Sequence, residues 1–210
     1  SMLSDIEPEC AFCPDMSKRE FAKWQKKVRK SMQEIMNFPK QQDNPPVPKC
    51  IHTVQRNGYR LEKWEDYPLS ECVSTFLVLI PDSLVKPSPA ILCIPGSGGS
   101  KEGLAGEPGV AAKFNDDYRN PKVTMAQNLV KAGYIAVAVD NPAAGEAADL
   151  EQYARGRNYN YDLFSRFLLE MGWSYLGYTA YLDMQVLEWM KSRPYIRKDR
   201  IVVSGFSLGT

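Results

Sequence analysis

The most informative segment of this chain reads Arg200-Ile201-Val202-Val203-Ser204-Gly205-Phe206-Ser207-Leu208-Gly209-Thr210. Its apolar first half predicts a short buried strand, and the pattern G-x-S-x-G follows at once. Small residues two places before and two places after Ser207 let the chain turn sharply without steric conflict. Because a serine on such a strand-to-helix turn presents its hydroxyl to solvent, we take Ser207 as a candidate nucleophile.

The segments before this run alternate between strand and helix patterns. Strands are predicted over residues 59–67, 72–81, 90–94, 134–139 and, as the fifth, 201–204. The last three are short and continuously apolar, which is typical of strands buried on both faces of a parallel sheet. Helical spacing covers residues 124–131 and 162–193, the second with a break or bend near Gly172 and Gly177. This order predicts an α/β fold with a mostly parallel sheet flanked by helices.

An additional helix is predicted near the N-terminus. Ser17-Lys18-Arg19-Glu20 fits a capping box, and an apolar stripe follows at spacings of three and four until Pro39, formed by Phe21, Trp24, Val28, Met32 and Ile35. The basic residues on the other face indicate a solvated surface more than a nucleic-acid site. After the proline-rich linker at 43–48, we divide the chain into a helical extension (1–49) and the N-terminal portion of an α/β domain (50–210), whose C-terminal part is absent.

Composition excludes several classes of partner. The chain has 210 residues, and 26 Lys+Arg against 25 Asp+Glu give a net charge of +1, so no overall field favours nucleic acid. No apolar run approaches the roughly 20 residues of a membrane span, and no signal-peptide pattern opens the sequence. Ser1-Met2 resembles a tag remnant, so a secreted or periplasmic location with its signal removed stays open.

The five cysteines give no clear disulfide framework, because they are odd in number and widely spread. Cys10-x-x-Cys13 suits half a zinc site, a disulfide or two free thiols. With no second such pair and one histidine in the chain, four metal ligands are hard to assemble. We therefore do not expect a metal site at these cysteines.

The loop after the strand at 90–94 reads Pro95-Gly96-Ser97-Gly98-Gly99-Ser100. Its glycines let backbone N–H groups point into a cleft, so the amides of Ser97 and Gly98, together with that of Leu208, suit an oxyanion hole. A nucleotide-binding loop is the alternative. It is disfavoured because Lys101 stands where the dinucleotide pattern needs glycine, and no helix is predicted to open before Thr124.

Polar residues also follow the strand at 134–139. Asp140 and Asn141 should line the same cleft and are candidate substrate-binding residues, although a carboxylate there more often bonds neighbouring loop amides. Glu102, Glu107, Asp116 and Asp117 are predicted to be surface charges. His52 is the chain's only imidazole, and it precedes the predicted strands. In proteins where G-x-S-x-G follows a strand, the catalytic base comes after the serine in sequence. We therefore do not expect His52 to be the base.

Taken together, these motifs resemble the α/β-hydrolase superfamily. The residues that carry the resemblance are Pro95-Gly96-Ser97-Gly98-Gly99, Asp140-Asn141-Pro142, Arg193-Pro194-Tyr195-Ile196 and Gly205-Phe206-Ser207-Leu208-Gly209-Thr210. Within the superfamily, residues 50–210 are similar to the dienelactone-hydrolase and acetyl-xylan-esterase branch. The resemblance implies Ser207 as nucleophile, the amides of Leu208, Ser97 and Gly98 as oxyanion donors, no cofactor, and small esters, particularly acetylated or uronate carbohydrates, as substrates. One departure is Pro95-Gly96, where many members have His-Gly.

The acid and the base of a catalytic triad have no candidates in this sequence, so we expect the 210-residue chain to be inactive alone. The last strand would then expose an edge, which the rest of the fold or a dimer partner would cover. A serine peptidase of the same fold and a non-catalytic binding module remain rival interpretations. The aromatic stretch 153–178, with Arg155, Arg157 and Arg166, suits either a sugar-binding wall or helices packed on the sheet.

Overall fold

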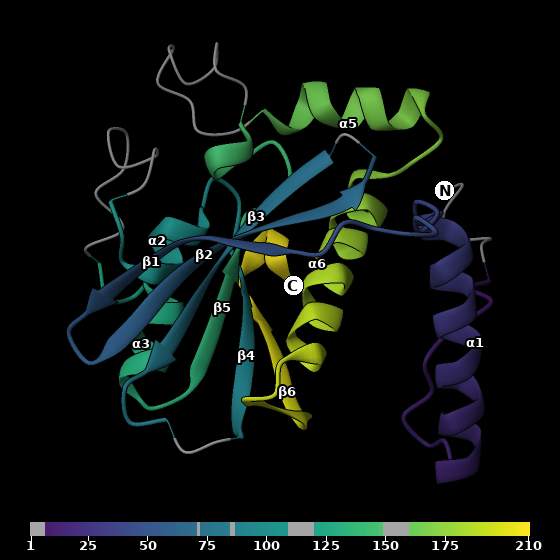
Figure 1. Ribbon diagram of the computed structural model, residues 1–210. Coiled ribbons are helices and arrows are strands. Elements are labelled where there is room, and N and C mark those ends of the chain that lie inside the picture. Colours follow the sequence, from purple (N-terminus) through teal and green to yellow (C-terminus); the bar gives the residue numbers. More distant parts are fainter. Residues whose placement is uncertain (1–6, 71, 85–86, 109–119, 149–159) are drawn as a thin grey trace.

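The computed structural model describes residues 7–70, 72–84, 87–108, 120–148 and 160–210. Six strands form one mixed sheet in the order β1-β2-β3-β5-β4-β6 (Figure 1). The β1–β2, β2–β3 and β3–β5 pairs are antiparallel, whereas β4 lies parallel to both β5 and β6. The strands are β1 Lys49–Arg56, β2 Tyr59–Leu69, β3 Cys72–Pro81, β4 Ser88–Ile94, β5 Ile135–Val139 and β6 Ile196–Gly205. The α/β class predicted from the sequence is confirmed, but the described sheet is mixed and not mostly parallel, because three of its five strand pairs are antiparallel.

Helices cover both faces of this sheet (Figure 1). The described helices are α1 Lys18–Met36, α2 Lys101–Ala105, α3 Met125–Lys131, α5 Tyr161–Glu170 and α6 Tyr175–Ser192, with the 3-10 turns η3 Gly145–Ala147 and η4 Ser207–Gly209. Side chains of α6 share one apolar cluster with the sheet, and side chains of α2 and α3 share a second cluster on the opposite face. Among the described residues, no helix has the length and hydropathy that crossing a bilayer requires.

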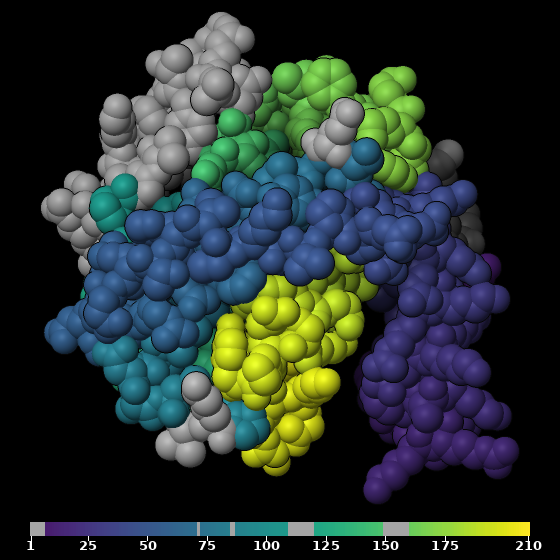
Figure 2. Space-filling view, in the orientation of Figure 1, coloured from purple at the N-terminus to yellow at the C-terminus, as the bar shows by residue number. Residues whose placement is uncertain are grey.

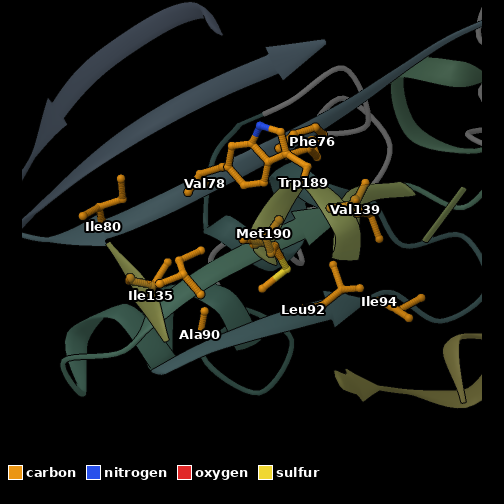
Figure 3. Close-up of a cluster of buried hydrophobic side chains, with 13 residues drawn as sticks. Phe76, Val78, Ile80, Ala90, Leu92, Ile94, Ile135, Val139, Trp189 and Met190 are labelled. Atoms are coloured by element: carbon orange, nitrogen blue, oxygen red, sulfur yellow. The ribbon is translucent and has the colours of Figure 1, made fainter. Parts of the chain in front are cut away.

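The core between the sheet and α6 forms around large side chains (Figure 3). Phe76 of β3 is fully buried, and its ring meets that of Trp189 edge-on with centroids 4.8 Å apart. Every residue of β5 is buried, as its continuous apolar run predicts. Burial of each such large side chain stabilises the fold by about 1.5–3 kcal/mol, so this core holds the strand ends that carry the loops.

The N-terminal helix begins as predicted but packs differently. Ser17 and Glu20 form both halves of the capping box, which fixes the start of α1. No residue of α1 is buried, and Ile35 in its apolar stripe is 80% exposed. On the face viewed in Figure 2, α1 (purple) meets the rest of the molecule at one end. The boundary at residue 49 stays a prediction.

That end is fixed by close contact with the start of α6. A Cβ on Gly177 would overlap the carbonyl oxygen of Met36, and the Asn37 amide donates to the Gly172 carbonyl at 2.7 Å. The predicted break between the two long helices falls at Gly172, which has φ of +77°. Gly177 lies inside α6 and marks a close approach of two backbones instead of a break.

Strand β1 is absent from the sequence-based prediction, and it forms one edge of the sheet. It is polar and largely exposed, so it lacks the alternation of apolar residues that reveals a strand in the sequence. At the opposite edge, β6 exposes Val202 and Val203 by more than half. Figure 2 shows this C-terminal segment (yellow) open on the viewed face.

Candidate active site

Ser207 lies on a strained turn directly after β6. Its φ of 52° is in the left-handed region, which non-glycine residues seldom adopt and which often marks a functional site. The side chain is exposed, so its hydroxyl is open to solvent. The glycines on either side are required by the backbone. A Cβ on Gly205 would overlap the Gly209 carbonyl oxygen, and one on Gly209 would lie 2.7 Å from the Ile94 carbonyl oxygen.

The loop after β4 packs directly against this turn. A Cβ on Gly96 would lie 2.9 Å from the ring of Phe206 and 3.3 Å from Cβ of Ser207, so glycine permits the contact. The structure therefore brings together the two loops from which the sequence predicts the nucleophile and the oxyanion donors. Strands β4 and β6 are parallel neighbours, so their carboxyl ends, and the loops that follow them, lie side by side.

The backbone amides of the glycine-rich loop have different partners. The Gly98 N–H donates to the hydroxyl of Tyr161 at 2.9 Å, and the Gly99 N–H donates to the Gly96 carbonyl at 3.0 Å. Within the described part of the chain, the N–H groups of Ser97 and Leu208 make no hydrogen bond. Ser97 and Leu208 are therefore the predicted donors whose amides remain available for a developing negative charge.

A helix opens directly after the loop, so the prediction that none begins before Thr124 is wrong. Ser100 caps α2 by accepting from the Gly103 N–H at 3.1 Å. The helix is only five residues long, which is too short for its apolar pattern to be recognised in the sequence. Its first amide, that of Lys101, donates to Asp140 at 2.7 Å. A carboxylate of the protein thus occupies the place where a phosphate would bind in a nucleotide site.

Asp140 belongs to a buried ion cluster that the sequence does not reveal. Its carboxylate is 2.5 Å from the Lys101 ammonium, which is fully buried and also lies 3.0 Å from Glu102 and 2.8 Å from Glu146. Lys63 adds a second cation, 2.6 Å from Glu146. The side chain of Asp140 is 6% exposed, so its contacts favour a structural role that ties the loop after β4 to the loop after β5.

The charges in this cluster shift one another's pKa values. Burial alone would lower the pKa of Lys101, but Asp140, Glu102 and Glu146 raise it above its usual range, so Lys101 stays charged. Burial raises the pKa of Asp140 against the opposing charge of Lys101. For Glu146, burial would raise the pKa, but Lys101 and Lys63 together lower it to about 2. The cluster is therefore held by charge at neutral pH.

Asn141 clamps the glycine-rich loop from behind. It is fully buried, and its amide donates to the Pro95 carbonyl at 2.9 Å and to the Gly96 carbonyl at 3.4 Å. Its own Oδ1 is buried without a hydrogen-bond partner in the described structure, which costs about 1–3 kcal/mol. The departure at Pro95 from the usual His-Gly is thus accompanied by a loop that is held through its main-chain carbonyls. Whether Asp140 or Asn141 contacts a substrate stays a prediction.

Two carboxylates predicted to be surface charges are partly buried instead. Glu102 is 14% exposed beside Lys101, and Glu107 is 15% exposed in a bidentate pair with Arg56 at 2.7 Å. The sequence shows the charges but not their partners, which lie on other elements. Neither residue is therefore freely solvated. Asp116 and Asp117, of which the same was predicted, lie outside the described residues.

His52 lies in β1, at the sheet edge opposite β6, and its side chain is exposed. Four strands separate β1 from β6, so the only imidazole of the chain is remote from Ser207. Cys10 and Cys13 form no disulfide bond. No cluster of three or more residues suited to a metal occurs in the described ranges.

The described part of the aromatic stretch packs as a row of rings between α5 and α6. Tyr161 meets Tyr175 at 5.5 Å, Phe164 meets Tyr178 at 5.6 Å, and Trp173 stacks on Tyr178 at 6.1 Å between centroids. Arg166 is exposed and pairs with Asp162 at 3.0 Å. Residues 153, 155 and 157, which belong to the same predicted stretch (Tyr153, Arg155 and Arg157), lie outside the described residues. No sequence pattern indicated that this row reaches the glycine-rich loop.

A strained serine turn after a parallel strand, with a glycine-rich loop packed beside it, defines an α/β hydrolase. The Abhydrolase family profile matches residues 1–210, and the chain belongs to this family. No curated protein matches the chain.

Solved structures show the same fold. A Bacteroides fragilis protein with the provisional designation acetyl xylan esterase is 69% identical, with a TM-score of 0.92, over 99% of this chain and 53% of that one. The chain therefore spans about half the length of this relative. Two others are similar in fold alone. They are a glucuronoyl esterase from Solibacter usitatus (15% identity, TM-score 0.54, 92% and 54% covered) and acetyl xylan esterase 1 from Thermoanaerobacterium sp. (14%, 0.55, 86% and 50%).

Proposed function

We propose that this chain carries the nucleophile of a serine carboxylesterase. The observation that carries the proposal is the turn at Ser207, which has a positive φ, is exposed, and packs against Gly96 of the glycine-rich loop. Strain of this kind persists only where the surrounding structure fixes it, and at a strand end it presents a nucleophile. The family assignment supports a hydrolase.

In the proposed reaction, Ser207 Oγ attacks the ester carbonyl while a base takes its proton. The N–H groups of Leu208 and Ser97 stabilise the negative oxygen of the tetrahedral intermediate. The intermediate collapses to an acyl-enzyme as the alcohol leaves with the proton from the base. Water then attacks the acyl carbonyl and gives a proton to the base. The base returns this proton to Ser207 Oγ as the bond between Oγ and the acyl carbon breaks, which releases the acid and free Ser207.

The base and its acid partner come, in this proposal, from polypeptide that packs beside β6. Two observations favour this position: His52 lies at the other edge of the sheet, and the edge of β6 exposes Val202 and Val203. We therefore propose that the 210-residue chain alone hydrolyses esters very slowly. The 69% identical relative is nearly twice as long, which is consistent with additional elements at that edge.

We propose acetylated or uronate-bearing carbohydrates as the substrate class. The support is the designation of the relatives, which are acetyl xylan esterases and a glucuronoyl esterase. The proposal predicts that acetylated xylo-oligosaccharides, and not short peptides, are turned over. A serine peptidase would reverse this preference, and a binding module would turn over neither.

The test compares ester hydrolysis by this chain and by the product of its complete gene, each with and without Ser207→Ala. We expect the complete product to release acetate from acetylated xylo-oligosaccharides and the variant to lose at least about 10³-fold in kcat. A fluorophosphonate should label Ser207 in the active form, as read by peptide mass. Full activity in Ser207→Ala would exclude Ser207 as nucleophile. Rapid turnover by the 210-residue chain would refute its proposed inactivity.

A further inference from the structure

Tyr161, the first residue of α5, reaches back to the glycine-rich loop. Its hydroxyl accepts a hydrogen bond from the Gly98 N–H at 2.9 Å, across 63 residues of sequence. Gly98 is one of the amides that the sequence predicts to stabilise an oxyanion. A tyrosine hydroxyl at this distance engages that amide directly.

Tyr161 is fixed independently of the loop that it contacts. Its ring meets the edge of Tyr175, whose hydroxyl donates to the Pro142 carbonyl at 3.0 Å. The neighbouring Asn160 N–H donates to the Ala143 carbonyl at 2.9 Å, and the Asn160 side chain caps α5. These contacts tie the start of α5 to the loop after β5, so the phenol oxygen is presented by a framework outside the glycine-rich loop.

The loop needs such an external partner at Gly98. Its φ of +72° lies in the left-handed region, where glycine has access to many backbone conformations. The Gly98 N–H belongs to the peptide unit that begins at the Ser97 carbonyl. That unit is joined at the Ser97 Cα to the preceding unit, which carries the Ser97 N–H, and that N–H lacks an internal partner in the described residues. Displacement of the Gly98 amide would move the Ser97 Cα and, with it, the Ser97 N–H. The hydrogen bond from Gly98 to Tyr161 opposes this displacement.

We propose that Tyr161 is a positioning residue for the oxyanion loop. It holds the Gly98 amide in a structural hydrogen bond and thereby orients the Ser97 N–H, which together with the Leu208 N–H stabilises the oxyanion. The inference rests on the proposed function, and it assigns different roles to two amides that the sequence treats alike. Gly98 is structural and Ser97 is the donor.

A second arrangement would give the same contact the opposite meaning. If the Gly98 N–H were itself an oxyanion donor, the Tyr161 oxygen would occupy the oxyanion position and would compete with the substrate. The separate anchoring of Tyr161 through Tyr175 and Asn160 favours positioning. The two arrangements predict opposite changes in rate when the hydroxyl is removed.

The test is Tyr161→Phe in the active form of the protein, with Tyr178→Phe as the matched control. Tyr178 lies in the same row of rings, but its hydroxyl contacts Cys72 Sγ at 3.1 Å and not the loop. We expect Tyr161→Phe to lower kcat for an acetyl ester about tenfold, less than the 10²–10³ lost when an oxyanion donor is removed outright. KM and the unfolding midpoint should change little, because the ring remains. Tyr178→Phe should leave kcat within about twofold. A kcat that is unchanged or raised by Tyr161→Phe would overturn the proposal.

Hydrogen exchange at the Gly98 amide tests the contact without relying on turnover. We expect NMR to show that the exchange rate of this amide rises at least about tenfold in Tyr161→Phe and does not change in Tyr178→Phe. Unchanged exchange in Tyr161→Phe would overturn the inference. Faster exchange together with unchanged kcat would refute the positioning role. If the unmodified protein hydrolyses no ester, the proposed function fails, and exchange alone decides whether Tyr161 orders the loop.

Discussion

The two turns that meet at the candidate site are held in different ways. The turn at 205–209 is held by close main-chain contacts, because Gly205 lets the Gly209 carbonyl approach and Gly209 lets the carbonyls of Ile94 and Pro95 approach, within a distance that a Cβ would forbid. The loop at 95–100 is held by side chains from elsewhere, namely Asn141 at Pro95, Tyr161 at Gly98 and Asp140 at the start of α2.

Because of this difference, we expect the turn at 205–209 to be rigid and the loop at 95–100 to be adjustable. A turn fixed by close backbone contacts has one conformation and presents Ser207 rigidly. A loop fixed by hydrogen bonds and charges changes when one partner is altered, so its amides are tuned by residues that never touch a substrate. The Pro95 carbonyl contacts both turns. It accepts a hydrogen bond from the Asn141 amide, and it lies 2.8 Å from the position that a Cβ on Gly209 would take.

The largest effect should come from removing the charge of Lys101, which lies at the centre of the side-chain contacts that hold the loop at 95–100. Lys101→Met leaves Asp140, Glu102 and Glu146 without their buried cation, and we expect a loss of about 3–5 kcal/mol in the free energy of unfolding. Urea denaturation measures it. Lys191→Met is the control, because Lys191 pairs with Glu188 at the surface and should change stability by less than about 0.5 kcal/mol. Equal effects of the two variants would show that the cluster does not hold the loop.

The backbone-held turn should respond to the smallest added side chain. Gly205→Ala would bring a methyl group into the Gly209 carbonyl oxygen, and we expect a loss of about 2–3 kcal/mol as the turn shifts. In the control Gly103→Ala, the new Cβ meets only Ser100 Oγ at 3.5 Å and lies in a helix, so stability should rise by about 0.5–1 kcal/mol. Both values come from the same denaturation series. A neutral Gly205→Ala would mean that the turn has room that its geometry denies.

The same difference explains what the sequence could predict. Gly205 and Ser207 act within the turn itself, where a Cβ on Gly205 would meet the Gly209 carbonyl oxygen, so the pattern alone reveals the turn and the residue presented. The buried runs of β4 and β5 likewise follow from local hydropathy. The G-x-S-x-G pattern and the apolar runs each extend over only a few residues. They can therefore be recognised in the sequence without knowledge of tertiary contacts.

Long-range partners could not be predicted in this way. Asn141 lies 46 residues from the Pro95 carbonyl that it binds, and Lys101 lies 39 residues from Asp140. A lysine after a glycine-rich loop ordinarily indicates a solvated or phosphate-binding residue, and only the fold shows it to be fully buried. Strand β1 is not predicted because its side chains are largely polar and exposed, and only its pairing with β2 shows that it is a strand.

Acid should affect the two turns differently, because ionisable groups hold only one of them. The pKa of Glu146 is lowered to about 2 in the fold, against an ordinary 4.5, so its contribution to stability is present above about pH 4.5 and is lost as the pH falls towards 2. Since its side chain is 35% exposed, solvent screening limits this contribution to about 1 kcal/mol. Hydrogen exchange should therefore accelerate between pH 4.5 and 3, after correction for the intrinsic pH dependence, in peptides covering 95–106 more than in those covering 205–210. Glu146→Gln should remove most of this difference because it abolishes the titration. Parallel acceleration of both turns in the unmodified chain would show that the framework around Lys101 and the turn at Ser207 open together, and the distinction between them would not hold in solution.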